Sequence, residues 1–241
     1  MEAAVSSAES PALHPGSALS DVLQDLPALY RKVSARYFGG SRTGRHFVPS
    51  KLKRDPATAE VLRQAAAAPR GFGHVVDLGC GRGQLGLALL LAGLASRVSG
   101  YDLDGLRIRD AQLAARGLPA EFAQADLNAP DLPAGDTLML MDVLYLLPEE
   151  GQARLLAAMA AAARERMVIR TVDPELGWRS TVGRGMEVLN RRLRGETAEG
   201  LCMMPMARLR QSLDALGFVA AVRPCWEGTP FPNVLVMAHR R

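Results

Sequence analysis

Cysteines, lysines, aromatic residues and long apolar runs are all scarce in this chain of 241 residues. Its three cysteines, Cys80, Cys202 and Cys225, are too few for a disulfide framework and too widely spaced for a paired C-x-x-C zinc signature. We therefore expect no metal site. Because no apolar run reaches about 18 residues, we also expect no membrane span. Hydrophobic residues still make up 48% of the chain, enough for one main domain with a full core.

The charge of the chain is modest. Its net charge of +4 gives little support to nucleic-acid binding. Only three of the 29 basic residues are lysine, a bias typical of a GC-rich genome rather than of a ligand. Residues 1–20 contain Glu2, Glu9, two prolines and no apolar segment of the kind found in signal peptides. We expect a disordered tail over 1–20 and a cytoplasmic protein.

Strand and helix patterns alternate from residue 74 to the C-terminus, which is typical of a sheet covered by helices on both faces. The predicted strands are Val75 to Leu78, Arg97 to Tyr101, Ala120 to Gln124, Thr137 to Met141, Arg166 to Val172, Gly217 to Arg223 and Val234 to His239. The predicted helices are Pro56 to Ala68, Gln84 to Ala95, Gly105 to Arg116, Glu149 to Ala163 and Pro205 to Leu216. A helical insertion is expected over residues 174–204, with its helix near Thr181 to Leu193.

A glycine-rich turn follows the first of these strands. Glycines at alternate positions allow a tight turn and a close approach of the backbone to a ligand, and two cofactor classes use such a turn. In one register, Gly81 to Gly86 matches the dinucleotide fingerprint G-x-G-x-x-G, and Asp102 lies where a ribose-binding acid is expected. That register extends the strand into the turn and buries the Asp77 carboxylate, which is costly. A turn that starts at Gly79 instead leaves Asp77 at the carboxyl end of the strand.

The turn resembles the first motif of the class I S-adenosylmethionine-dependent methyltransferases, an apolar strand followed by D-x-G-x-G-x-G. The residues at its defined positions are Asp77, Gly79, Gly81 and Gly83. Acids follow the next two strands as well, and the segment Asp136 to Leu147 is similar to the family's fourth strand and following loop. The resemblance implies a Rossmann-like α/β fold over residues 71–241. In it, a doubly wound, seven-stranded sheet is mostly parallel with one antiparallel strand near the C-terminus.

The resemblance also implies S-adenosylmethionine as the cofactor, with a role for each strand end. Asp77 and the Gly79 backbone would hold the methionine ammonium, and Asp102 would accept the two ribose hydroxyls. Asp104 is a nearby rival for the ribose. As a structural alternative, each acid is a helix N-cap or a turn residue.

The third strand end and the loop supply the remaining cofactor contacts. By the same resemblance, Asp126 and the Leu127 N–H would bind the adenine, and Leu103 would pack on its ring. The other expected cofactor contacts are Cys80, Gly81, Gly83, Gln84, Met141 and Asp142. Cys80 also has a plain interpretation as a small packing residue.

Methyl transfer asks the protein mainly to align a nucleophile about 3 to 3.5 Å from the methyl group and to exclude water. In this family the acceptor contacts come from the N-terminal segment, the loop after the fourth strand and the insertion after the fifth. The catalytic candidates are His46, Tyr145 and Asp173, and the substrate-binding candidates are Arg45, Lys51, Trp178 and Arg179. Histidine titrates near neutral pH, which makes His46 the candidate base. The structural alternatives are capping for His46, packing for Tyr145, a turn for Asp173, and anchoring of the insertion for Trp178 and Arg179.

The segment from Arg31 to Arg54 carries eight basic residues and no acid, interleaved with aromatic residues. We expect a basic helical cap over 21–70. It suits an anionic acceptor, an acyl carrier protein or RNA, although a solvated basic face explains its charge equally well. The stretch Arg45 to Pro56, with Thr171 to Glu175, loosely resembles bacterial methyltransferases of aryl-polyene and related pigment pathways. That resemblance implies an aromatic, carrier-bound or free acceptor.

These features predict an enzyme that methylates a small molecule, at an oxygen of an aromatic or acyl intermediate of secondary metabolism. The alternatives are an RNA methyltransferase, an NAD-dependent oxidoreductase that uses the other glycine register, and a non-catalytic module with the same fold. Asp142-Val143-Leu144-Tyr145 stands where N-methylating relatives carry Asn-Pro-Pro-Tyr, which disfavours DNA adenine and protein glutamine as acceptors. Both a monomer and a homodimer fit the sequence.

Overall fold

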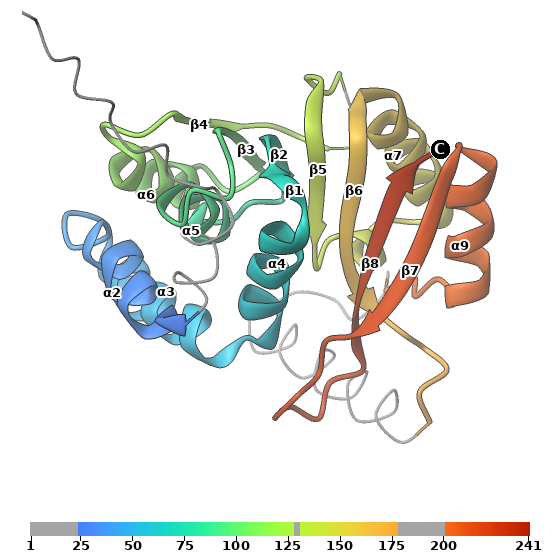
Figure 1. Cartoon of the computed structure of the whole chain (residues 1–241), viewed down its shortest axis with the longest axis horizontal. Coiled ribbons are helices and arrows are strands. Elements are labelled where there is room, and N and C mark those ends of the chain that lie inside the picture. Colours follow the sequence, from blue (N-terminus) through green and yellow to red (C-terminus); the bar gives the residue numbers. More distant parts are fainter. Residues whose placement is uncertain (1–23, 128–130, 178–200) are drawn as a thin grey trace, which may run out of the picture.

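A seven-stranded sheet forms the centre of the computed structural model, which describes residues 24–127, 131–177 and 201–241 (Figure 1). The strand order is β4-β3-β2-β5-β6-β8-β7. The strands are β2 His74–Leu78, β3 Arg97–Asp102, β4 Ala120–Gln124, β5 Gly135–Met141, β6 Ala163–Val172, β7 Phe218–Pro224 and β8 Asn233–Arg240. Only β8 runs against its neighbours, β6 and β7, and the remaining pairs are parallel. The predicted Rossmann-like sheet is confirmed, including its one antiparallel strand.

The central strands are apolar on both faces, because helices cover both sides of the sheet. Along β5, Leu138 and Leu140 face one buried cluster and Met139 faces the other. The alternation in β6 is the same, with Met167 and Ile169 on one side and Val168 on the other. The sheet therefore separates two cores and defines a doubly wound, three-layer fold.

Helices lie on both faces of the sheet (Figure 1). One face carries α5 Gln84–Leu91 and α6 Gly105–Ala115, and the other carries α7 Glu149–Ala162 and α9 Met206–Ala215. The 3-10 helix η1, Leu144–Leu146, follows β5. The predicted extension of α5 to Ala95 is wrong, because Gly93 adopts a φ of 70° and ends the helix.

The N-terminal part packs against α5 as three helices. They are α2 Leu26–Ala35, α3 Arg42–Arg54 and α4 Pro56–Ala67, followed by the short strand β1, Pro69–Phe72. Leu29, Val33 and Val48 of these helices are buried in the same core as α5. Asp55 ends α3 and also begins α4, where its side chain accepts a hydrogen bond from Ala57 N. The predicted tail over 1–20 and the helix near Thr181 to Leu193 lie outside the described residues.

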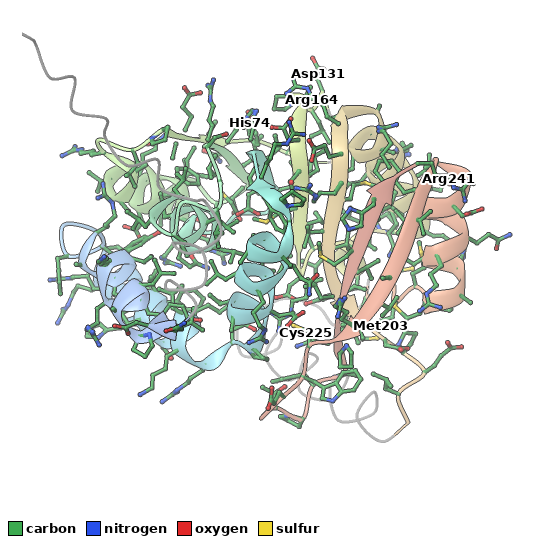
Figure 2. All side chains as sticks on the ribbon, viewed as in Figure 1. His74, Asp131, Arg164, Met203, Cys225 and Arg241 are labelled. Atoms are coloured by element: carbon green, nitrogen blue, oxygen red, sulfur yellow. The ribbon has the colours of Figure 1, made fainter. Side chains whose placement is uncertain are left out.

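The parallel strands bring their carboxyl ends to one edge of the sheet. In Figure 2, His74 and Arg164 lie at the opposite, amino edge, whereas Met203 and Cys225 lie at the carboxyl edge. Ligands of open α/β sheets bind outside this carboxyl edge. No helix in the described part of the chain is long and apolar enough to cross a membrane. Among the described residues, no group of histidine, cysteine and acidic side chains has an arrangement suited to a metal ion.

Candidate functional site: a cofactor cradle beside a charged cavity

The loop between β2 and α5 turns sharply because three of its glycines have left-handed backbone conformations. Gly79, Gly81 and Gly83 have φ angles of 71°, 58° and 73°, a region that other residues rarely occupy. A Cβ on Gly83 would lie 2.5 Å from the Phe122 ring. A Cβ on Gly79 would lie 2.3 Å from Val143 Cγ2, but one on Gly81 would meet nothing within 4 Å. The loop is therefore tightly packed at two glycines and open at the third.

Asp77 is the penultimate residue of β2, and the turn begins at Gly79 as predicted. The carboxylate is nevertheless buried, with 2% of the residue exposed, and its Oδ1 has no hydrogen-bond partner. Burial, with a further contribution from the Asp102 charge, raises the pKa of Asp77 to about 7. An unpartnered buried carboxylate is costly, and a cationic ligand group would offset that cost. The loop thus has the acceptor that an ammonium group requires.

Asp102, the last residue of β3, is bound to the glycine loop. Its Oδ2 accepts a hydrogen bond from Gly81 N at 2.8 Å, and its Oδ1 accepts one from Asp104 N at 2.9 Å. Each carboxylate oxygen can accept a further bond, so Asp102 keeps capacity for the hydroxyls of a ribose. Asp104 is instead the N-cap of α6, because its Oδ1 accepts from Leu106 N and Arg107 N. Asp104 therefore has the N-cap role of the structural alternative, whereas Asp102 combines a turn contact with Asp104 N and a contact with the glycine loop.

The residues expected to contact adenine lie at neighbouring strand ends. Asp126 and Leu127 follow β4, whose last residue, Gln124, is paired with Asp102. Asp126 is exposed and Leu127 is half-buried. Leu103, directly after β3, is 67% exposed, which leaves an apolar side chain accessible to a flat ring.

The other cofactor candidates differ in what they offer a ligand. Cys80 is buried, and burial raises the pKa of its thiol well above the ordinary value, so its packing interpretation holds. Gln84 begins α5, and its Oε1 is a second buried acceptor without a partner beside the loop. Met141 ends β5, half-buried and packed against the core that contains α5.

Residues between α2 and α3 bind the glycine loop, directly and through Asp110 of α6. The Tyr37 hydroxyl donates to the Arg82 carbonyl at 2.6 Å, and Arg82 Nε lies 3.0 Å from Asp110 Oδ2. Asp110 also accepts hydrogen bonds from the N–H and the hydroxyl of Ser41, at 2.8 and 2.6 Å. Burial alone would raise the pKa of Asp110, but the bonds from Ser41 and Arg82 lower it. The start of α3 is thereby fixed to the loop.

A cavity of about 380 Å³ lies beside the loop, between α3, the residues after β5 and the end of β6. Three of the predicted residues line it, namely Lys51, Asp142 and Tyr145. Val143, between the last two, is the side chain that a Cβ on Gly79 would strike. Phe47 lines the cavity, and the Arg82 guanidinium of the loop lies 5.3 Å from its ring, so the cavity and the glycine loop are adjacent.

Four charged side chains form a connected cluster in the cavity wall, which we call the ion-pair cluster: Lys51, Asp55, Asp142 and Arg170. Arg170 Nη1 donates to Asp55 Oδ2 at 2.7 Å and to Asp142 Oδ2 at 2.9 Å. Lys51 Nζ lies 2.6 Å from the same Asp55 oxygen and 3.7 Å from Asp142 Oδ2. Burial alone would raise the pKa of Asp55, but Arg170 and Lys51 lower it. For Arg170, burial favours a lower pKa, and the two carboxylates raise it.

Asp142 also has an unusual backbone. Its φ of 62° is the one positive value outside glycine in the described part of the chain. Such conformations are concentrated at functional sites, where the surroundings maintain them. The contacts of its carboxylate are with Arg170 and Lys51 rather than with the glycine loop. The structure thus places this predicted cofactor residue in the cavity.

Several candidates do not reach the cavity. His46 and Arg45 are exposed on α3 and do not line it. Asp173 follows β6, and its Oδ1 accepts a hydrogen bond from Glu175 N at 2.9 Å, so it forms the turn that was its structural alternative. Trp178 and Arg179 lie outside the described residues.

Sequence reasoning missed Arg170 and Asp55. The available signal for Arg170 is its position in the apolar strand Arg166 to Val172, because a buried charge requires partners. Asp55 directly precedes the helix predicted from Pro56, which is the position of an N-cap and gives no sign of an ion pair. Its ion pair with Arg170 joins residues that are 115 positions apart, and no local pattern predicts it.

Residues 75–166 match the model of a family described as a methyltransferase domain. The structure is similar to the crystal structure of magnesium protoporphyrin IX methyltransferase from Synechocystis PCC 6803 with bound S-adenosylhomocysteine. The TM-score is 0.61 and the identity 20%, over 92% of this chain and 99% of that chain. It is also similar to the mitomycin 7-O-methyltransferase, with a TM-score of 0.59 and 18% identity over 95% of this chain and 74% of that one. At these identities the likeness shows the fold.

A curated relative matches a shorter stretch. The ribosomal RNA small subunit methyltransferase C of Pseudomonas aeruginosa is 40% identical over 74 residues, and the match covers 30% of this chain and 22% of that protein. The family match assigns residues 75–166 to a methyltransferase domain, and the sheet and the glycine loop agree with the fold and first motif expected of the class I S-adenosylmethionine-dependent methyltransferases. They favour the methyltransferase register of the loop over the dinucleotide register.

Proposed function

We propose that this chain transfers a methyl group from S-adenosylmethionine to an oxygen of a small aromatic or acyl molecule. The observation that carries the proposal is the cavity next to the glycine loop, since Phe47 lines the cavity and its ring lies 5.3 Å from the Arg82 guanidinium of the loop. Its volume of about 380 Å³ falls in the range of small-ligand pockets, roughly 300 to 1,000 Å³. The similar structures include methyltransferases named for two small molecules, mitomycin and magnesium protoporphyrin IX.

The glycine loop and the strand ends beside it are suited to the cofactor, which when bound supplies an activated methyl group. In our proposal, the unpartnered Oδ1 of Asp77 accepts from the ammonium group, and the Gly81 N–H holds Asp102 toward the ribose. The exposed Leu103 side chain covers one face of the adenine, and Asp126 with the Leu127 N–H reads its edge. Methylation depends on these groups for binding and orientation.

On the acceptor side, the residues position the nucleophile and exclude water. Phe47 and Phe231 provide apolar walls, and Tyr145 provides a hydroxyl beside the loop after β5. Lys51 and Asp142 provide charge at the end nearest β5 and β6. His46 and Arg45 stand on the outer side of α3 in this arrangement, so we assign neither of them to the reaction.

The proposal is tested with the purified full chain and labelled S-adenosylmethionine. The acceptors are a panel of phenols, aromatic carboxylates and acyl carboxylates, and in a parallel reaction ribosomal RNA. We expect S-adenosylhomocysteine to raise the melting temperature and label to enter a member of the panel, detected by mass spectrometry.

Other outcomes contradict the proposal in distinct ways. Labelling of RNA with binding that falls steeply with salt would favour RNA as the acceptor. Stabilisation by NADH and not by S-adenosylhomocysteine would indicate an oxidoreductase. Stabilisation by neither would indicate a non-catalytic module.

A further inference from the structure

The charge that the cavity can offer a ligand follows from which of its charged groups are already paired. Two carboxylates, Asp55 and Asp142, and three cationic side chains, Lys51, Arg54 and Arg170, line the cavity. A carboxylate bound on several sides is a poor partner for a ligand cation. A cation without a pair remains available to a ligand anion.

Both carboxylates are engaged. Asp55 accepts from Ala57 N at 3.0 Å, from Lys51 Nζ at 2.6 Å and from Arg170 Nη1 at 2.7 Å, and its side chain is 8% exposed. Asp142 accepts from Arg170 at 2.9 Å and has Lys51 Nζ at 3.7 Å. A cationic acceptor would therefore have to compete with cations of the protein.

The cations are less completely paired. Arg54 makes no ion pair within the described part of the chain. The Lys51 side chain is 34% exposed, and its contact with Asp142 is long, at 3.7 Å. Arg170 is buried, and its Nε has no hydrogen-bond partner among the described residues. Among the described residues that line the cavity, three cations face two carboxylates, which is an excess of one positive charge.

The rest of the lining suits a flat apolar body. Phe47 and Phe231 contribute aromatic rings, and Met203 contributes an adaptable apolar side chain. Phe47 also lies under the Arg82 guanidinium, 5.3 Å from it, which fixes the ring between the cavity and the glycine loop.

Building on the proposed function, we propose that the acceptor binds as an anion, an aromatic molecule whose carboxylate or phosphate is held by Arg54 and Lys51. Its ring lies against Phe47 and Phe231. The anion need not displace a protein carboxylate, because Arg54 makes no ion pair with any described residue and the Lys51 side chain is 34% exposed. The ion-pair cluster forms the floor of the cavity beneath the bound anion.

The test measures binding of four matched probes to the full chain saturated with S-adenosylhomocysteine, by calorimetry or ligand-observed NMR. The probes are benzoate, phenyl phosphate, neutral benzamide and cationic benzylamine. We expect benzoate or phenyl phosphate to bind about tenfold more tightly than benzamide, the gain of one charge-assisted contact. Whichever of the two binds better identifies the anionic group. Benzylamine should bind most weakly.

Variants show whether the preference arises in the cavity. Arg54→Gln and Lys51→Gln should each remove most of the preference for the anion. Lys53→Ala changes the net charge equally from the same helix but does not line the cavity, so it should leave the preference intact. Arg54→Gln is the safer variant, because Arg54 is exposed and outside the ion-pair cluster.

Three results would overturn the inference: benzamide or benzylamine binding as tightly as the anions, an equal loss in Lys53→Ala, or no binding of any probe. If S-adenosylhomocysteine binds and the anions are not preferred, only this inference fails. If S-adenosylhomocysteine itself does not bind, the proposed function fails with it.

Discussion

The two halves of the carboxyl edge of the sheet differ in whether their buried carboxylates are paired with cations of the protein. Beside β2, Asp77 is buried with an unpartnered oxygen and a pKa raised to about 7. Beside β5 and β6, the Asp55 side chain is 8% exposed, but it is bound by Arg170 and Lys51, which lower its pKa. Both acids are desolvated, and only one has been supplied with protein cations.

From this difference we infer the charge of the ligand group that each half would bind. An acid that the fold leaves without a counter-ion is matched to a cation brought by a ligand, such as the ammonium group of S-adenosylmethionine. Acids already neutralised by the protein leave a surplus of positive charge for the other ligand. In our proposal, the same residue type binds the cofactor in one place and supports the acceptor site in the other.

The largest effect is expected at the paired acid. Asp55→Asn leaves Arg170 and Lys51 without one of their carboxylates, and breaking a buried pair costs about 3 to 5 kcal/mol. Urea unfolding should show this loss in free energy. Asp142→Asn, whose side chain is 29% exposed, should cost less. If the two variants are equally stable and match the parent chain, the cluster does not support the fold.

The pH dependence of stability should differ in sign between the two acids. Asp77 has an ordinary pKa of 3.8 when unfolded and about 7 when folded, so the folded state holds a proton that the unfolded state releases. Its contribution is present at low pH and is lost as the pH rises through about 7. Asp55, with a lowered pKa, contributes above its ordinary pKa and loses that contribution as the pH falls.

Unfolding of the ligand-free chain at about pH 5 and pH 8 separates these contributions. Asp77→Asn should remove the loss of stability toward pH 8 that the parent chain shows. A variant that keeps the same slope would show that Asp77 is already ionised in the folded protein.

A smaller effect should distinguish the packed and open glycines of the loop. Gly83→Ala places a Cβ 2.5 Å from Phe122, whereas Gly81→Ala meets nothing within 4 Å, and both carry a similar backbone strain of about 1 to 2 kcal/mol. Gly83→Ala should therefore have the lower melting temperature. Gly81→Ala should mainly weaken binding of S-adenosylhomocysteine, because its new methyl group projects into the open cradle. The reverse ranking would contradict the packing described here.

The sequence was sufficient for the fold and for the turn of the glycine loop, because both depend on local patterns. Apolar strands and the D-x-G-x-G-x-G spacing lie within short stretches, and the strands and the turn from Gly79 are where they were predicted. Asp104 shows the limit even there, since two acids two residues apart compete for the ribose and only the hydrogen bonds identify the N-cap.

The acceptor side could not be predicted to the same extent. Its cluster joins Asp55 of the N-terminal helices to Arg170 of β6, a contact set by tertiary packing. His46, the predicted base, is exposed on α3 and does not line the cavity. Lys51, on the same helix, does line it. The rotation of α3 about its axis decides which of the two faces the cavity. The segment from Arg31 to Arg54 has too few apolar residues to define that rotation from the sequence.

The most direct test of the contrast between the two acids is calorimetric titration of the Asp77→Asn variant with S-adenosylhomocysteine. We predict that the ligand-free variant is at least as stable as the parent chain at pH 8 and that its affinity for S-adenosylhomocysteine is about 10- to 100-fold weaker. Asp104→Asn is the matched control, since asparagine is an equally good N-cap, and it should bind as the parent does. Unchanged affinity in Asp77→Asn, or a loss of stability like that of Asp55→Asn, would contradict the account.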